Sequence, residues 1–130
     1  MNDTMLTEGQ VFRKFTHFTA FLYFYMAFSD DFLDEKEAEM IVKKMQAQAV
    51  EGEDVAALYE EVMATYKATP PDALDELIQT NFEYFKHESQ EYKYGLFTDL
   101  YDVMIADGVV HYKENESLDK LKNLVNTYLL

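Results

Sequence analysis

Hydrophobic residues recur every three or four positions along most of this chain, which is the spacing of a helix that packs one face on a core. The segment 8–28 has two adjoining apolar faces, as expected for a central helix buried on more than one side. Segments with one apolar face follow at about 34–50, 53–69, 70–87 and 89–106, and a last one runs from the turn after 106 to the C-terminus. No alternating strand pattern persists for more than a few residues. We therefore predict an all-α fold: a single-domain bundle, residues 1–130, of about six helices.

Local signals set several of the predicted helix boundaries. Asp34 is a good N-cap, with Glu37 three residues later at the position of a capping-box carboxylate. Glu53 or Asp54 is placed to start the third helix, and Pro71 or Pro70 suits the first position of the fourth, where a missing N–H costs nothing. In the fifth predicted helix, the residues expected to face the core are Tyr94, Phe97, Leu100, Tyr101 and Met104.

Two acidic turns organise the chain, and they resemble each other. The second lies in Val103–Glu116, VMIADGVVHYKENE, and a looser copy lies in Met26–Glu39, MAFSDDFLDEKEAE. The copies align at an offset of 77 positions, which pairs Asp30 with Asp107 and Glu37 with Glu114. We interpret them as two pseudo-repeated helix–turn–helix units. Because both glutamates stand near predicted helix N-termini, they are suited to interact with the exposed N–H groups and the helix dipole.

The segments A-D-G-V-V-H-Y-K-E and S-D-D-F-L-D-E-K-E resemble the pattern of the TerB-like proteins, which are associated with bacterial tellurite resistance. The resemblance covers most of the chain and implies an all-helical fold of two related halves, a role in bacterial stress response and binding of a divalent metal by acidic residues. The implied metal ligands are Asp30, Asp34, Glu37, Asp107 and Glu114. Two positions depart from the pattern: Asp31 replaces the turn glycine, and His111 stands where an acidic or hydroxyl N-cap is usual.

The acidic residues of the two turns have two interpretations. Their oxygens suit Ca²⁺, Mg²⁺ or Mn²⁺, and His111 would extend the choice to Zn²⁺. Alternatively, the carboxylates cap helices and satisfy backbone N–H groups, and His111 faces solvent. The spacing is not that of an EF-hand loop.

The chain carries a net charge of −14, from 25 acidic and 11 basic residues. This charge repels phosphate backbones, so we do not expect nucleic-acid binding, whereas metal cations or a basic protein partner are favoured. There is no Cys, which excludes disulfides and thiolate chemistry and fits a cytoplasmic protein. No nucleophile–base signature, phosphate loop or H-E-x-x-H motif is present, so we expect no enzymatic activity.

The aromatic segment 15–28 raises the question of a membrane or signal segment. It is too short to span a bilayer, which needs about 20 apolar residues. It also contains Thr16, His17 and Thr19, and no small-residue cleavage site follows it. The sequence thus supports two hypotheses: a TerB-like module that binds a divalent cation, and an acidic protein-interaction module without metal. It leaves the ion, the partner and the oligomeric state open.

Overall fold

The computed structural model describes residues 6–7, 9–28, 35–91, 93–106, 116, 118–120 and 122–123. At 89, 90, 93 and 94 it describes the backbone alone. Both acidic turns, 29–34 and 107–115, lie outside the described residues. The described part of the chain consists of helices and their connections, with one isolated β-bridge between Leu6 and Phe12, and the predicted all-α fold is confirmed.

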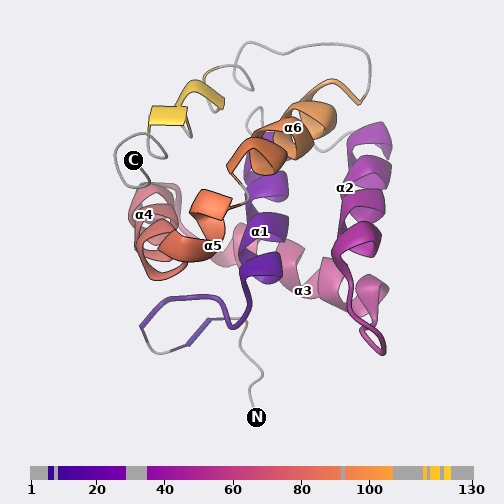
Figure 1. The fold of residues 1–130 in the computed structure, drawn as a ribbon, viewed down its shortest axis with the longest axis horizontal. Coiled ribbons are helices and arrows are strands. Elements are labelled where there is room, and N and C mark those ends of the chain that lie inside the picture. The colour runs from indigo at the N-terminus through magenta and orange to yellow at the C-terminus, as the bar shows by residue number, and fades with distance from the viewer. Residues whose placement is uncertain are drawn as a thin grey trace.

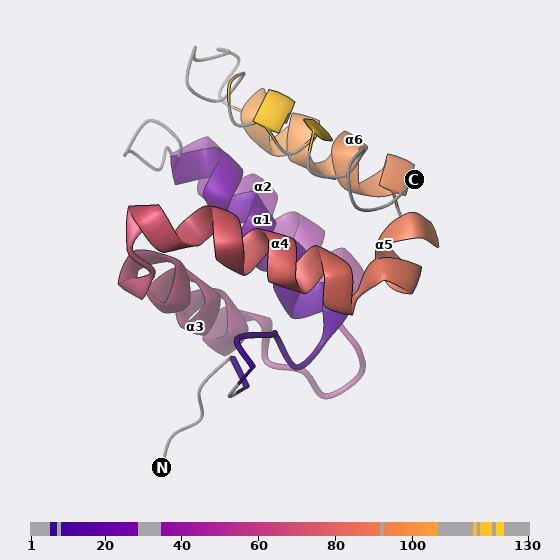
Figure 2. The same ribbon diagram turned by 90° about the vertical axis from the view of Figure 1, so that its left-hand side faces the viewer.

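Six α-helices and one short 3-10 helix make up this part of the chain (Figures 1 and 2). In chain order they are α1 (Phe15–Ala27), α2 (Glu35–Gln48), α3 (Val55–Ala68), η2 (Pro71–Ala73), α4 (Leu74–Tyr84), α5 (Lys86–Glu91) and α6 (Lys93–Met104). The described residues between 116 and 123 are also helical. No helix among those described is long and apolar enough to cross a membrane.

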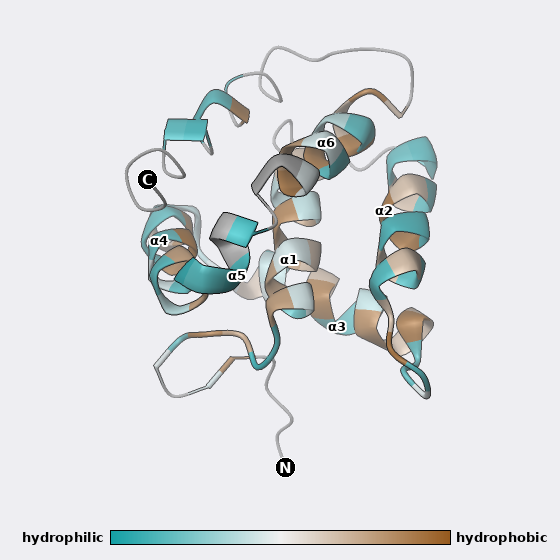
Figure 3. Ribbon diagram, viewed as in Figure 1, coloured by the Kyte–Doolittle hydropathy of each residue, from teal (hydrophilic) through white to brown (hydrophobic). Residues whose placement is uncertain are grey.

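Helix α1 lies at the centre, in contact with α2, α3 and α6 (Figure 1). Every residue from Phe18 to Ala27 is buried, so the predicted burial of more than one face is confirmed. Rings from the surrounding helices pack on it: Phe18 meets Phe82 of α4 at 5.1 Å between centroids, and Phe24 meets Tyr59 of α3 at 5.1 Å. Such pairs contribute roughly 0.5–1.5 kcal/mol beyond the burial of their area. The outer helices α2 and α4 alternate hydrophilic and hydrophobic residues, as one-sided burial requires (Figure 3).

Two helix starts follow the local signals in the sequence. The Asp54 carboxylate accepts a hydrogen bond from the Ala57 N–H at 3.1 Å, so Asp54, one of the two residues predicted to start this helix, is the N-cap of α3. Pro71 is the first residue of η2, which leads directly into α4, and its missing N–H leaves no intrahelical bond unmade. Gly52 takes a positive φ of 87° in the α2–α3 connection, four residues after α2 has ended at Gln48.

The predicted start of the first helix is wrong, because the described residues 9–14 are not helical. They belong to a tight reversal formed by residues 6, 7 and 9–12, which we call the N-terminal hook. Its backbone is closed by a hydrogen bond from Thr7 N–H to Val11 O at 2.9 Å, and Gln10 adopts a positive φ of 62°. Phe12 is nevertheless buried, as its apolar character requires.

The predicted fourth and fifth helices also differ from the structure. Helix α4 ends at Tyr84, and Phe85 turns into the core, where its ring lies 5.7 Å from Phe15 and 6.1 Å from Phe18. The short helix α5 then occupies residues for which the sequence predicts the end of one longer helix and the start of the next. In α6, Leu100 and Met104 face the core as predicted, but Tyr101 is 49% exposed. Leu96 and Val103 are buried, so the apolar stripe is rotated relative to the predicted one.

Candidate functional site

Glu37 is the one predicted metal ligand within the described residues, and it lies in the first turn of α2 with 1% of its surface exposed. A carboxylate is rarely buried so completely unless hydrogen bonds, an opposite charge or a helix dipole compensate it. The N-terminus of α2 supplies part of that compensation. The other predicted site residues lie outside the described part of the chain: Asp30, Asp31, Asp34, Asp107, His111 and Glu114.

The helix ends that flank the two acidic turns lie at the same end of the bundle (Figures 1 and 2). The first turn follows α1, which ends at Ala27, and precedes α2, which begins at Glu35. The second turn follows α6, which ends at Met104 and contacts both α1 and α2. Ala27 and Met104 are 77 positions apart, the same offset that aligns the two turns in the sequence. The structural equivalence of the turns themselves stays a prediction.

Lys44 connects α2 to α6 through two aspartates. Its ammonium nitrogen lies 2.9 Å from Asp99 Oδ1 and 2.6 Å from Asp102 Oδ2, and its side chain is 19% exposed. Burial lowers the pKa of Lys44, but hydrogen bonds to Asp102 and Asp99 and the charges of both carboxylates outweigh it and raise that pKa. The ammonium therefore stays protonated at neutral pH and is not available as a nucleophile.

A chain of buried polar groups continues from this ion pair into α1. The Tyr23 hydroxyl, on a fully buried side chain, donates to Asp99 Oδ2 at 3.3 Å and accepts from Gln48 Nε2 at 2.8 Å. Thr19 Oγ1 lies 2.9 Å from Gln48 Oε1 and 2.9 Å from the Thr16 carbonyl oxygen. Each polar group in this network of Tyr23, Gln48, Thr19 and Asp99 thus has a partner, as a stable interior requires. The network fixes α1, α2 and α6 relative to one another.

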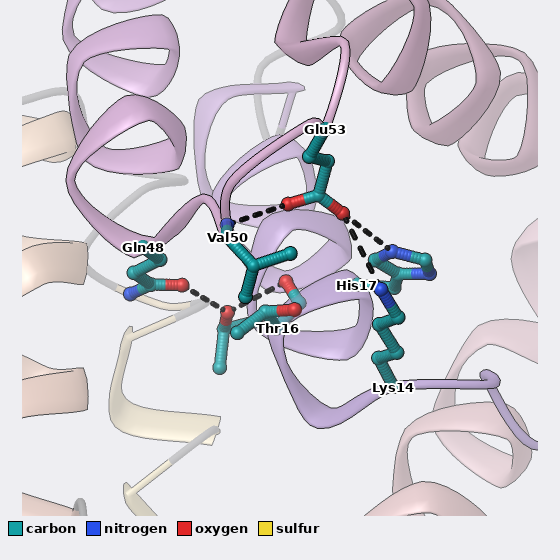
Figure 4. A network of polar contacts seen from close by, with 7 residues as sticks. Lys14, Thr16, His17, Gln48, Val50 and Glu53 are labelled. Carbon is teal, nitrogen blue, oxygen red and sulfur yellow. Dashed lines mark hydrogen bonds and ion pairs between the residues drawn. The ribbon is translucent and has the colours of Figure 1, made fainter.

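A second polar cluster joins the start of α1 to the α2–α3 connection (Figure 4). Glu53 Oε2 lies 3.4 Å from His17 Nε2 and 3.8 Å from Lys14 Nζ, while Glu53 Oε1 accepts from the Val50 N–H at 3.3 Å. The His17 and Glu53 side chains are each 13% exposed. His17 Nδ1 is buried and has no hydrogen-bond partner among the described residues. This arrangement pins a connecting loop to the central helix.

Sequence reasoning missed both clusters, because their members are distant in the chain. Lys44 and Asp102 are separated by 58 positions, and His17 and Glu53 by 36. One local signal was present: Asp99 and Asp102 are three positions apart, so they share a face of α6 and can hold one cation between them.

Within the described residues, no group of three or more His, Asp or Glu side chains is arranged to hold a metal ion. In the two networks above, the carboxylates instead contact protein side chains: Asp99 and Asp102 contact Lys44, and Glu53 contacts Lys14 and His17. No protein-family model, curated protein or solved structure matches this chain.

Proposed function

We propose that this chain is a non-catalytic, TerB-like module that binds a divalent cation through its two acidic turns and acts in bacterial stress response. One observation carries the proposal. The helix ends that lead into both turns lie at one end of the bundle, and the buried carboxylate of Glu37 lies in the helix that begins there. The family assignment rests on the resemblance of the two turn segments to the TerB-like pattern.

The chemistry of the turn residues favours a hard cation. Asp30, Asp34 and Glu37 from one turn region, with Asp107 and Glu114 from the other, offer carboxylate oxygens of the kind that Ca²⁺, Mg²⁺ and Mn²⁺ prefer. A nearby imidazole from His111, with Asp31 as a further oxygen donor, would favour Mn²⁺ or Zn²⁺. The net charge of −14 also raises the concentration of cations near the surface.

Isothermal titration calorimetry on chelator-treated protein tests this proposal. We expect saturable heat with at least one of Ca²⁺, Mg²⁺, Mn²⁺ and Zn²⁺, and at least a tenfold loss of affinity in Asp107→Asn. The matched control is Glu83→Gln, which removes an exposed charge from α4, away from the turns, and leaves the affinity unchanged. Absence of saturable heat with all four ions, or equal loss in both variants, would contradict the proposal.

A second candidate is an acidic interaction module that docks a basic protein and holds no metal. It is favoured by the net charge and by the exposed carboxylates along α2, α3 and α4, which are Glu35, Glu39, Glu60, Glu61, Glu76 and Glu83. In a pull-down, this function predicts a partner that dissociates at high salt, because salt screens exposed charges, and that is unaffected by chelator. A partner that dissociates on addition of chelator would favour the cation-binding function instead.

A further inference from the structure

A pocket of about 870 Å³ opens between the N-terminal hook, α3, η2 and α4. Its volume is within the range of roughly 300–1,000 Å³ that is usual for small-molecule sites. In the chain the hook precedes α1, whereas the acidic turns follow α1 and α6. The described residues that line the pocket include none of those proposed to bind the cation. The pocket is therefore distinct from the site of the proposed function.

One wall of the pocket is held in place by a buried amide. Asn81 of α4 is fully buried, and its Oδ1 accepts a hydrogen bond from the Phe12 N–H at 2.9 Å. Its Nδ2 donates to the carbonyl oxygens of Gln10 at 3.0 Å and Leu77 at 2.9 Å. A buried amide is costly unless its hydrogen bonds are made, and here they fix the backbone of the hook. The wall is thus preorganised before any ligand arrives.

The lining of the pocket combines an apolar surface with acidic groups. The apolar part comes from Leu6, Ala64, Ala68, Pro70, Ala73 and Leu77. Glu61 of α3 and Glu76 of α4 add two carboxylates, and no Lys, Arg or His is among the described residues of the lining. These two carboxylates would therefore repel an anionic ligand and attract a cationic one.

Two threonines in the lining offer oxygen lone pairs and no proton. The Thr65 hydroxyl donates to the Glu61 carbonyl oxygen at 2.9 Å, and the Thr69 hydroxyl donates to the Thr65 carbonyl oxygen at 2.8 Å. Because each hydroxyl has a single proton, only acceptor capacity remains for a ligand. Acceptors and carboxylates together suit a group that carries several N–H donors and a positive charge, such as a primary ammonium.

We infer that this pocket binds an amphipathic primary amine, with its ammonium group near the carboxylates and threonine oxygens and its hydrocarbon chain on the alanine and leucine side chains. The inference does not depend on the acidic turns or on a metal. Two kinds of interaction contribute. Charge complementarity orients the head group, and burial of the chain contributes about fourfold in affinity for each CH₂ group.

Calorimetry with hexylammonium as the probe, and hexanoate as its anionic counterpart, tests the charge preference. We expect saturable binding of hexylammonium and none of hexanoate. Butylammonium, two CH₂ groups shorter, should bind roughly fifteenfold more weakly. Equal binding of hexylammonium and hexanoate, or no saturable binding of either, would overturn the inference. The same titration in the presence of a metal chelator should be unchanged, which separates this site from the proposed cation site.

Two substitutions locate the site. Ala68→Leu adds a branched side chain at an exposed position of the lining and should weaken hexylammonium binding at least tenfold while circular dichroism stays unchanged. Glu61→Gln should weaken it several-fold, and this difference should shrink at high salt because the charge contact is screened. Glu83→Gln, on α4 but outside the lining, is the matched control and should bind like the wild type. Wild-type affinity in both Ala68→Leu and Glu61→Gln would rule out this pocket.

Discussion

Lys44 of α2 and Asp102 of α6 lie 2.6 Å apart, and this ion pair joins two helices whose contact residues are 58 positions apart in the chain. Asp99 shares the same ammonium at 2.9 Å and receives the Tyr23 hydroxyl of α1 at 3.3 Å. The Lys44 ammonium group and its two aspartates thus connect three helices. Both α1 and α6 lead into acidic turns, so the network also fixes the helix ends from which those turns start.

Replacement of Lys44 by methionine should therefore destabilise the protein. The change keeps an unbranched side chain only one atom shorter but leaves the 15%-exposed Asp99 carboxylate without the lysine ammonium group. We expect a loss of about 2–3 kcal/mol in the free energy of unfolding, the size usual for hydrogen bonds to charged groups. Urea unfolding measures it. Lys43→Met, at the exposed neighbouring position, is the control and should change stability by less than about 0.5 kcal/mol. Equal effects of the two substitutions would contradict a structural role for the network.

The stability of the protein should fall at alkaline pH. The pKa of Lys44 is raised above its usual value of 10.5, because the hydrogen bonds and charges of its two aspartates outweigh its burial. Burial, with the charge of Glu60, raises the pKa of Tyr59 above 10.0. A group whose pKa is raised on folding contributes stability that is present below its unfolded pKa and lost as the pH rises through its folded pKa. Stability from these groups should thus hold up to about pH 10 and decline above it.

Thermal unfolding between pH 8 and pH 11.5 measures this decline. In Lys44→Met the loss above pH 10 should be smaller than in the wild type, because one of the responsible groups is absent. The exposed Lys120, whose pKa is raised chiefly by its hydrogen bond to Asp75, should add little, since its side chain is 53% exposed. An identical alkaline decline in wild type and Lys44→Met would show that Lys44 is not responsible.

The N-terminal hook should lose its fixed backbone when Asn81 is replaced by alanine. The substitution leaves the buried Phe12 N–H without its acceptor, at a cost of roughly 1–3 kcal/mol. Amide hydrogen exchange followed by NMR should show lower protection at Phe12, while protection at the centre of α1 changes less. Glu83→Ala, on the same helix but exposed, is the control and should leave exchange at Phe12 unaltered. Unchanged protection of Phe12 in Asn81→Ala would contradict the role given to this amide.

Features of the fold that depend on neighbouring residues were predictable from the sequence. The start of α3 needs only a capping carboxylate, which limited the choice to Glu53 or Asp54, and the break before α4 needs only the prolines at 70 and 71. The N-terminal hook was not predictable, because apolar spacing favours a helix there. Its conformation depends on Asn81, which lies 69 positions from Phe12. The local preference for helix is overridden in the hook, because the distant Asn81 side chain makes hydrogen bonds to its backbone.

The candidate site was predictable to a smaller degree. The sequence placed Glu37 in the first turn of the second helix, and the structure confirms that position and adds its burial. Burial of a carboxylate depends on how neighbouring helices pack over it. The spacing of apolar residues within one helix does not specify that packing. The same limit explains why the contacts of Lys44 and Glu53 were missed. Cation binding by the two turns stays a prediction.

The most direct test of cation binding at the acidic turns is paramagnetic broadening of NMR signals by sub-stoichiometric Mn²⁺. If the two turns share a cation, we expect early loss of the amide signals of the residues next to both turns, namely Phe28, Glu35, Lys36, Glu37, Ile105 and Ala106. Acidic positions elsewhere, such as Asp54 and Asp72, should keep their signals at the same Mn²⁺ concentration. Broadening that is uniform over all acidic residues, or that is confined to one of the two turns, would contradict a single site shared between them.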